Sequence, residues 1–303
     1  MDRPVRGRRR ASRVLSAALE ASIEGLYITV AHTSGTDLIL QTKLYDLAME
    51  FGRQGKVKIV KRRDAEARDK GSTYKQIPPD DGGVNGCVNL AIWKGIFAKV
   101  CSRCCCHCRK LISLKAKPPT ASKDLMQSGP RLNASLDLLK DLARLSARIE
   151  HLCFLVDGEW YVKMKHFDER LRRRNNAYDT LKSNEPSIFH GRSVIFNRAT
   201  DVHKDMNDPY ANLTPLVTLG TYTEGHLVCP EIGVSLAYRP GTVTLVRGGM
   251  IAHGVRYTGG QRVCVAHFQH RTMLQAYDEP APEINKYIPI SERSDLKSAV
   301  WNP

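Results

Sequence analysis

The chain has 303 residues, 42% of them hydrophobic, which is enough to fill the core of one large domain or two small ones. No segment is long and apolar enough to cross a bilayer as a helix, so we expect no membrane partner. Residues 1–185 hold 35 Lys and Arg against 21 Asp and Glu, whereas residues 186–303 hold 11 against 10. The basic half predicts a polyanionic partner, nucleic acid first; a solvated basic surface is the alternative.

The first 13 residues are rich in arginine and predict a disordered basic arm. Two glutamates interrupt the moderately apolar run that follows, which argues against a secretory signal. An arginine-rich nuclear address or nucleic-acid arm favours a nuclear location, with a cytoplasmic or mitochondrial location as the alternatives.

Residues 14–130 are predicted to form an N-terminal basic region. We expect a helix over Arg13–Ile23, a strand over Leu26–Ala31 and a second helix around Leu44–Phe51. Residues 61–85 are charged and then rich in Gly and Pro, which predicts a mobile loop.

A cysteine-rich segment follows at residues 101–108. Nine cysteines without a signal peptide indicate a reducing compartment, so we expect thiols or metal ligands rather than disulfides. Thiolates and imidazole are suitable zinc ligands. One short stretch supplies all four ligands of a tetrahedral site poorly, although Cys87 or Cys153 could complete the site. We therefore do not expect zinc there. The candidate ligands are Cys101, Cys104, Cys105, Cys106, His107 and Cys108.

Residues 131–303 are predicted to form a second domain with a β-core over residues 187–273. It opens with a helix over Leu132–Leu152, whose large aliphatic residues recur every three or four positions and would brace the outside of a barrel. From Ser187 onward, short apolar runs alternate with turns about every ten residues, as in an all-β barrel or sandwich. The runs are Ser193–Phe196, Leu216–Tyr222, His226–Cys229, Val234–Tyr238, Thr242–Val246, His253–Tyr257 and Arg262–His270.

Three residues in this core have the pattern of an iron site. Side chains alternate along a strand, so His203 and Asp205 would point to the same side. His253 supplies a second imidazole further along the chain. Two imidazoles and one carboxylate form the facial triad that holds non-haem Fe(II) and leaves coordination positions open. We therefore predict that these three residues are the metal ligands and the catalytic residues.

Arg262 follows the second histidine and would bind a carboxylate through its planar guanidinium group. On a strand, Arg262 and Cys264 would share one face, while Val263 and Val265 would share the other. Arg256 is the competing anchor. A 2-oxo acid and dioxygen would then fill the open positions on iron and together supply an oxidant for unactivated C–H bonds.

A second His-X-Asp motif occurs at His166–Asp168. It lies in the highly charged segment Lys165–Arg174, which we predict to be helical, and no suitable strand or arginine follows it. We interpret this copy as surface.

The core resembles the Fe(II)/2-oxoglutarate dioxygenases over about residues 187–273. Within that superfamily it is most similar to the TET/JBP branch, particularly its fungal members. The resemblance implies an α+β chain with a double-stranded β-helix (jelly-roll) core braced by N-terminal helices, which makes residues 131–303 a dioxygenase catalytic domain. The motifs that carry the resemblance are Asn197-Arg198, Gly225–Gly233, Tyr238–Gly241, Gly248–Val255 and Gly260–Arg262, together with the His-X-Asp itself.

The resemblance also implies the cofactors: Fe(II) on the triad, O2, and 2-oxoglutarate anchored by Arg262 with Asn197 and Cys264 beside it. Related enzymes often carry a small hydroxyl residue two positions after the anchoring arginine, where this chain has Cys264.

Polar residues that follow the His-X-Asp approach the base in the TET/JBP branch. Here the residues after the motif are Met206, Asn207 and Asp208. Asp208 would accept a hydrogen bond from an exocyclic amine of the base, and Asn207 would donate or accept one. The alternative is that Asn207 and Asp208 only form a turn with Pro209. Basic stretches at Arg53–Lys75, Lys94–Lys123 and Lys163–Arg174 would hold phosphates.

The resemblance implies oxidation of a methyl group on a nucleic-acid base, 5-methylcytosine or N6-methyladenine, with duplex DNA as the first candidate partner. The alternative is a 2-oxoglutarate oxygenase that hydroxylates a small molecule or a protein side chain. A non-catalytic jelly-roll binding module is the third hypothesis, and the intact triad disfavours it.

Overall fold

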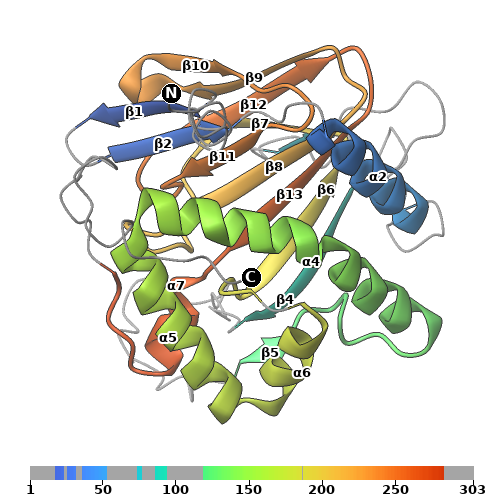
Figure 1. Ribbon diagram of the computed structural model, residues 1–303, viewed down its shortest axis with the longest axis vertical. Coiled ribbons are helices and arrows are strands. Elements are labelled where there is room, and N and C mark those ends of the chain that lie inside the picture. The colour runs from blue at the N-terminus through green and yellow to red at the C-terminus, as the bar shows by residue number, and fades with distance from the viewer. Residues whose placement is uncertain are drawn as a thin grey trace, which may run out of the picture.

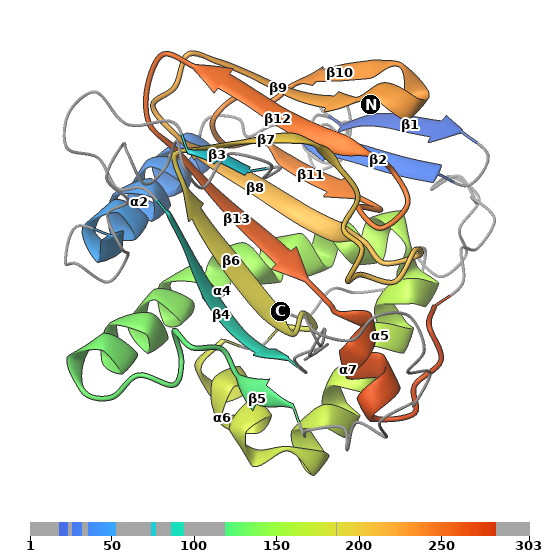
Figure 2. The same cartoon turned by 180° about the vertical axis from the view of Figure 1, so that it is seen from behind.

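Two antiparallel sheets face each other, and helices cover the outside of the larger one (Figures 1 and 2). The computed structural model describes residues 18–23, 26–31, 36–52, 74–76, 86–93, 119–185 and 187–282. The predicted basic arm and the cysteine-rich segment lie outside these residues. Most of the predicted loop at residues 61–85 and most of the basic stretches before Lys123 also lie outside them.

Eight strands form the predicted jelly roll. Strands β11, β8, β13 and β6 lie in the larger sheet, and β10, β9, β12 and β7 lie in the smaller sheet, so the chain passes repeatedly from one sheet to the other. This winding is the double-stranded β-helix, and the fold prediction is confirmed. The strands are β6 (Gly191–Phe196), β7 (Arg198–His203), β8 (Thr214–Gly220), β9 (Glu224–Cys229), β10 (Val234–Ala237), β11 (Val243–Val246), β12 (His253–Thr258) and β13 (Arg262–Phe268).

Segments from the N-terminal half extend both sheets. β2 (Leu26–Ala31) pairs with β11, and β1 (Ala18–Ile23) pairs with β2. At the other edge, β4 (Gly86–Trp93) pairs with β6 and with the short β5 (Thr120–Ala121). These strands share a sheet with the jelly roll, although the sequence suggested separate regions on either side of residue 130.

Two local predictions in this half were wrong. The segment predicted as a helix over Arg13–Ile23 contains strand β1, because its pairing with β2 along the sheet edge overrides local helical preference. Within the predicted loop, β3 (Tyr74–Gln76) pairs with β7 at the edge of the smaller sheet. A strand of three residues is too short to show a period in the sequence.

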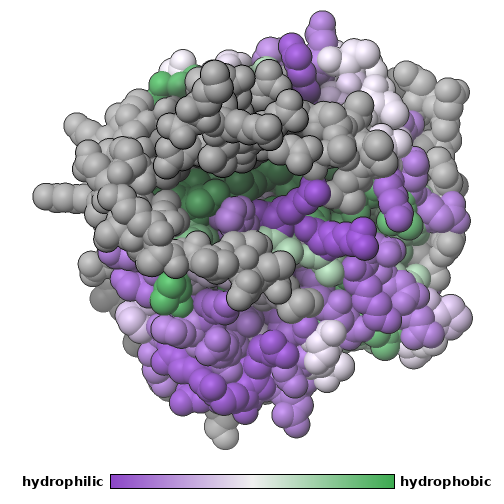
Figure 3. All heavy atoms as spheres, in the orientation of Figure 1, coloured by the Kyte–Doolittle hydropathy of each residue, from purple (hydrophilic) through white to green (hydrophobic). Residues whose placement is uncertain are grey.

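The helices α2 (Thr36–Phe51), α4 (Pro130–Val156), α5 (Gly158–Arg174) and α6 (Asn176–Asn184) contribute to one core with the larger sheet. α4 crosses the sheet (Figure 1), and its predicted apolar stripe is buried at Leu139, Leu142, Leu145 and Ile149. A short α7 (Arg271–Ala276) follows β13. Figure 3 shows that the outward surface of the helices at the bottom of the same view is mainly hydrophilic. No described helix is long and apolar enough to cross a membrane.

The larger sheet therefore has an outer face toward the helices and an inner face toward the smaller sheet. Along β13, Val263 and Val265 join the core shared with the helices, whereas Cys264 joins a smaller cluster between the sheets. Arg262 and Cys264 also line a cavity between the sheets. The predicted alternation of these side chains is confirmed.

Candidate metal centre and co-substrate cavity

The two histidines of the predicted triad are direct neighbours across two strands. β7 and β12 are antiparallel, and His203 at the end of β7 lies opposite His253 at the start of β12. A register shift between His253 and Val255 interrupts the ladder just beside this pair. Pairing brings the two ring centroids within 4.7 Å of each other.

Hydrogen bonds orient both imidazole rings. Nδ1 of His203 lies 2.9 Å from the carbonyl oxygen of Asp201, and Nδ1 of His253 lies 3.0 Å from that of Ile251. A carbonyl only accepts, so a neutral ring carries its proton on Nδ1 and has its lone pair on Nε2. This outer hydrogen bond is typical of histidines that bind a metal through Nε2.

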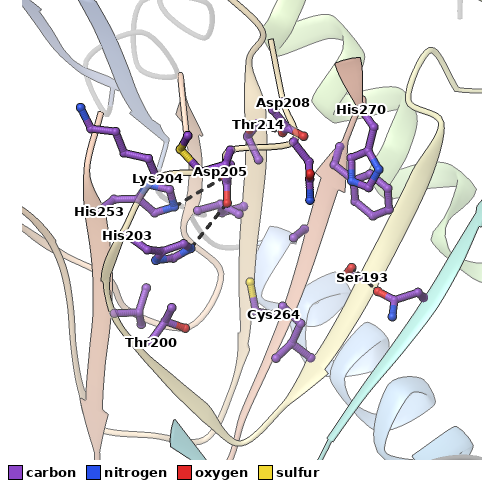
Figure 4. Close-up of a pocket in the computed structure, with 18 of the residues that line it drawn as sticks. Ser193, Thr200, His203, Lys204, Asp205, Asp208, Thr214, His253, Cys264 and His270 are labelled. Carbon is purple, nitrogen blue, oxygen red and sulfur yellow. Dashed lines mark hydrogen bonds and ion pairs between the residues drawn. The ribbon is translucent and has the colours of Figure 1, made fainter. Parts of the chain in front are cut away.

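Asp205 completes the cluster from a loop rather than from the strand. β7 ends at His203, and the backbone N–H of Asp205 donates to the carbonyl of Gly248 at 2.8 Å. His203 and Asp205 do lie close together, but not because side chains alternate along one strand. Figure 4 shows the Asp205 carboxylate between the two rings, with its oxygens 3.5 Å from Nε2 of His203 and 3.8 Å from Nε2 of His253.

Gly248 makes room for this carboxylate. A methyl group added at Gly248 would overlap Oδ2 of Asp205 and lie 3.2 Å from Cε1 of His253. One candidate ligand atom from each member of the triad lies within 4.8 Å of the others. Two imidazole nitrogens, one carboxylate and a backbone shaped around them fit the donor set of a non-haem iron site.

The ionisable groups of the cluster stabilise one another. Burial raises the pKa of Asp205, but the adjacent His203 and His253 outweigh it and hold that pKa below its usual value. Burial lowers the pKa of His253. For His203, burial acts in the same direction, but hydrogen bonds to Asp205 and to the Asp201 carbonyl raise its pKa overall. At neutral pH the carboxylate is ionised and ready to bind a cation.

The cluster opens into a cavity of about 710 Å³ between the two sheets. Arg262, the predicted co-substrate anchor, lines the same cavity and is only 3% exposed. Among the residues that the structure describes, no carboxylate forms an ion pair with Arg262. A buried guanidinium without a counter-ion is costly, so this site favours an anionic ligand.

A chain of hydroxyl groups fixes the guanidinium of Arg262. Its Nε donates to Oγ1 of Thr218 at 3.1 Å, Thr218 lies 2.8 Å from the Tyr222 hydroxyl, and Tyr222 donates to the carbonyl of Tyr238 at 2.6 Å. Because Thr218 is the cross-strand partner of Cys264, the neighbouring strand supplies the hydroxyl that is absent at Cys264. The guanidinium carbon also lies 5.3 Å from the centre of the Tyr238 ring.

The other predicted co-substrate residues take different places. Arg256, the competing anchor, is exposed on β12, so it cannot serve the cavity as Arg262 does. Cys264 is buried and lines the cavity. Asn197 adopts a left-handed backbone with φ of 46°, and its side-chain oxygen accepts from the backbone N–H of Arg262 at 2.7 Å. Asn197 thus holds the backbone of the arginine.

Asn207 and Asp208, the predicted substrate residues, both line the cavity. Asn207 is exposed, whereas Asp208 is buried and accepts a hydrogen bond from Thr214 at 3.1 Å. Burial and the charge of Asp205 raise the pKa of Asp208 well above its usual value. The turn and the cavity lining are both observed, so the two interpretations of this pair are compatible.

An aromatic wall was missed by the sequence analysis. Trp93 and His270 are stacked with their ring planes 7° apart, and Phe268 stacks on His270 with centroids 4.6 Å apart. All three line the cavity, as does Asn89, whose Oδ1 accepts from Ser193 at 2.6 Å. Burial lowers the pKa of His270 to about 4, so that ring is neutral at pH 7. Trp93 and Asn89 come from β4, far away in sequence, where no local pattern marks them.

The second His-X-Asp motif lies in α5, as predicted. His166 is exposed, but Asp168 is buried and accepts a hydrogen bond from the Tyr178 hydroxyl at 2.6 Å. The surface prediction holds for the histidine and is wrong for the aspartate, because the carboxylate packs between α5 and α6.

Part of the chain matches a known protein family. Residues 158–271 match the Tet_JBP family, described as the oxygenase domain of the 2OGFeDO superfamily. A search of curated proteins found no match. Among solved structures, NgTET1 in complex with 5mC DNA is similar with a TM-score of 0.40 and 13% identity, over 84% of this chain and 77% of that chain. The chain therefore carries an oxygenase domain, in the residues 158–271 that match Tet_JBP.

Proposed function

We propose that the cavity oxidises a methyl group on a nucleic-acid base, using Fe(II), 2-oxoglutarate and O2. The observation that carries the proposal is the presence of three groups in one cavity: the His203–Asp205–His253 cluster, the buried Arg262 and the aromatic wall. His203 and His253 would hold iron through Nε2, and Asp205 would hold it through a carboxylate oxygen. Bound iron supplies the activation of O2 that C–H oxidation requires.

Arg262 would anchor the carboxylate of 2-oxoglutarate that does not reach the metal. Its Nε is engaged by Thr218 and one terminal nitrogen donates to the carbonyl of Arg198 at 3.1 Å, which leaves further N–H groups for a ligand. The anion would neutralise the buried charge, and the Thr218–Tyr222 chain would keep the guanidinium in position. These residues bind and orient; they move no proton.

The aromatic wall supports a planar substrate. The stacked rings of Trp93, His270 and Phe268 present flat surfaces of the kind on which bases stack. Asn89, Asp208 and the neutral His270 supply polar groups for a base edge. A base in a duplex would have to leave the stack to enter this cavity. The chain's net charge of +15 favours a polyanion over a neutral metabolite.

Incubation with defined oligonucleotides tests this function. The full chain is supplied with Fe(II), 2-oxoglutarate and duplexes that carry 5-methylcytosine, N6-methyladenine or no methyl group. Mass spectrometry of the nucleosides and a succinate assay are read together. We expect the methylated nucleoside of one duplex to be consumed, with one succinate formed for each oxidation step, and neither change with the His203→Ala variant.

His166→Ala is the matched control, because His166 belongs to the other His-X-Asp motif and is exposed on α5. It should retain full activity. Succinate formation that no oligonucleotide stimulates would overturn the base substrate and favour a small molecule or protein side chain. Unchanged activity of His203→Ala would overturn the assignment of the site.

A further inference from the structure

Large apolar side chains are exposed beside the mouth of the cavity. Among the side chains that the structure describes, five large hydrophobic ones are exposed, and three of them lie between residues 202 and 210. Val202 is 44% exposed, Met206 is 70% exposed and Tyr210 is 56% exposed. Val202 and Met206 also line the cavity. Single exposed hydrophobic residues are ordinary, but a local group at a binding site indicates a contact surface.

Hydrogen bonds to buried residues fix the loop that carries Met206 and Tyr210. The side chain of Asn212 accepts from Nε1 of Trp160 at 3.1 Å and donates to Oε1 of Gln269 at 3.1 Å. Asp208 is buried, and its backbone N–H donates to the carbonyl of Asp205 at 2.9 Å. Met206 and Tyr210 therefore project from an anchored loop. Binding through these two side chains would cost little conformational entropy of the loop.

The Arg271 side chain lies beside Tyr210. The Arg271 guanidinium carbon is 5.2 Å from the centre of the Tyr210 ring, and its terminal nitrogen donates to the carbonyl of Asp208 at 3.2 Å. No carboxylate among the described residues forms an ion pair with Arg271. Apolar surface next to an uncompensated guanidinium complements a nucleic acid, which offers base faces next to phosphates.

We propose that Met206 and Tyr210 form a wedge that enters the gap left in a duplex when the target nucleotide moves into the cavity, with Arg271 on an adjacent phosphate. The wedge rests on the proposed function. Apolar side chains that insert between base steps stabilise such opened duplexes. The wedge and the cavity mouth lie together, because Met206 follows the metal ligand Asp205 and Arg271 follows His270 of the aromatic wall.

The test measures the affinity of the protein for duplex and for single-stranded oligonucleotides, without Fe(II) or 2-oxoglutarate, so that no turnover occurs. One oligonucleotide carries 2-aminopurine next to 5-methylcytosine, a second carries it next to N6-methyladenine, and each is used alone and annealed. The wild type should raise the fluorescence of one duplex. Met206→Ala combined with Tyr210→Ala should remove most of that rise and weaken duplex binding roughly tenfold, the size expected for losing a stacking contact. Single-strand affinity should change less than about twofold, because a single strand has no gap to fill.

Two variants sharpen the result. Tyr210→Phe should bind the duplex as tightly as the wild type does, whereas Tyr210→Ala should bind it more weakly, because stacking needs the ring and not the hydroxyl. Met126→Ala removes another exposed methionine, 62% exposed and outside the cavity lining, and should leave both affinities unchanged. Urea denaturation should show that each variant has the same unfolding free energy as the wild type, so that a change in affinity does not reflect unfolding.

Three outcomes would overturn the wedge: no fluorescence rise with wild type, equal loss on duplex and single strand, or self-association of the wild type that the double alanine variant abolishes without any effect on DNA. Failure of the base-oxidation assay is separate, because duplex opening is read without Fe(II) or 2-oxoglutarate.

Discussion

The two faces of the larger sheet treat buried charge in opposite ways. On the outer face, Arg192 is fully buried and paired with Glu185 at 2.6 Å, and the Glu185 carboxylate also accepts from Ser146. On the inner face, Arg262 is equally buried but has no carboxylate partner among the described residues. The buried charge of the outer face is paired within the protein itself, whereas the buried charge of the inner face is left to bind a ligand. This contrast separates residues that maintain the fold from residues that serve the reaction.

The largest effect on stability should come from breaking the outer pair. Arg192→Met leaves the buried Glu185 carboxylate without a cationic partner, and such a change costs about 3–5 kcal/mol of unfolding free energy. Urea denaturation measures it. Arg172→Met is the control, because the Arg172–Asp179 pair is exposed and should contribute less than about 1 kcal/mol. Equal effects of the two variants would contradict the role assigned to the outer pair.

Among changes that leave the three candidate ligands in place, the largest effect on activity should come from closing the space around Asp205. Gly248→Ala places a methyl group against the carboxylate and should lower turnover by about a hundredfold or more, since even the outer partners of metal ligands contribute 10- to 100-fold. Gly233→Ala is the control: it adds a methyl group at a left-handed glycine, with φ of 65°, but nothing lies within 4 Å of the added methyl. Normal iron-dependent turnover in Gly248→Ala would show that the carboxylate is not needed where the structure places it.

Removing the inner charge should separate stability from function. Arg262→Leu should raise the 2-oxoglutarate concentration for half-maximal rate by about tenfold or more, the loss of a charge-assisted hydrogen-bonded contact. The unfolding free energy should stay within about 1 kcal/mol or rise, because an unpaired buried charge is replaced by an apolar group. Arg256→Leu, on the exposed side of β12, should change neither quantity. A large loss of stability in Arg262→Leu would contradict the proposal that its counter-ion is the ligand.

The smallest effect concerns pH and a buried histidine of the outer region. Burial, followed by the charge of Lys182, lowers the pKa of His190 well below 6.5. Below pH 6.5 the unfolded chain therefore binds one proton more than the folded chain, and stability falls as pH decreases. The slope from this residue is at most about 1.4 kcal/mol per pH unit.

His190→Phe should reduce that slope, measured by urea denaturation between pH 6.5 and 5. The site accepts an aromatic ring, because the centroid of the Phe167 ring lies 5.5 Å from that of His190 in an edge-on contact. His166→Phe, which changes an exposed histidine, should leave the slope unchanged. Identical slopes in wild type and His190→Phe would show that His190 does not stay neutral in the fold.

The sequence predicted those parts of the fold that have a local period. The stripe of α4 and the alternation of Arg262 and Cys264 with the valines of β13 are visible in the order of residues. β7 was missed because its six residues are mostly polar and none is fully buried, so no apolar alternation marks it. β1 was taken for a helix because pairing with a distant edge leaves no trace in a short segment.

The site was predictable where its residues are close in sequence or have a characteristic chemistry. His203, Asp205, His253 and Arg262 have the characteristic chemistry, and His203 and Asp205 are also close in sequence. The aromatic wall was not predictable in this way: Trp93 comes from β4, which reaches Phe268 and His270 only because β4 pairs with β6 at the sheet edge. Which strand joins the edge of a jelly roll is decided by tertiary packing, and a single sequence does not encode it in any local pattern.

Metal binding tests the central claim most directly. Mn(II) is the suitable probe, because it prefers carboxylate and imidazole ligands and, unlike zinc, has little affinity for the thiols of the cysteine-rich segment. Titration of the full chain, followed by electron paramagnetic resonance, should show one tightly bound ion in the wild type and in His166→Ala, and none in His253→Ala at the same folded fraction. A His253→Ala protein that binds one Mn(II) ion as tightly as the wild type would contradict the assignment of His203, Asp205 and His253 as the iron site.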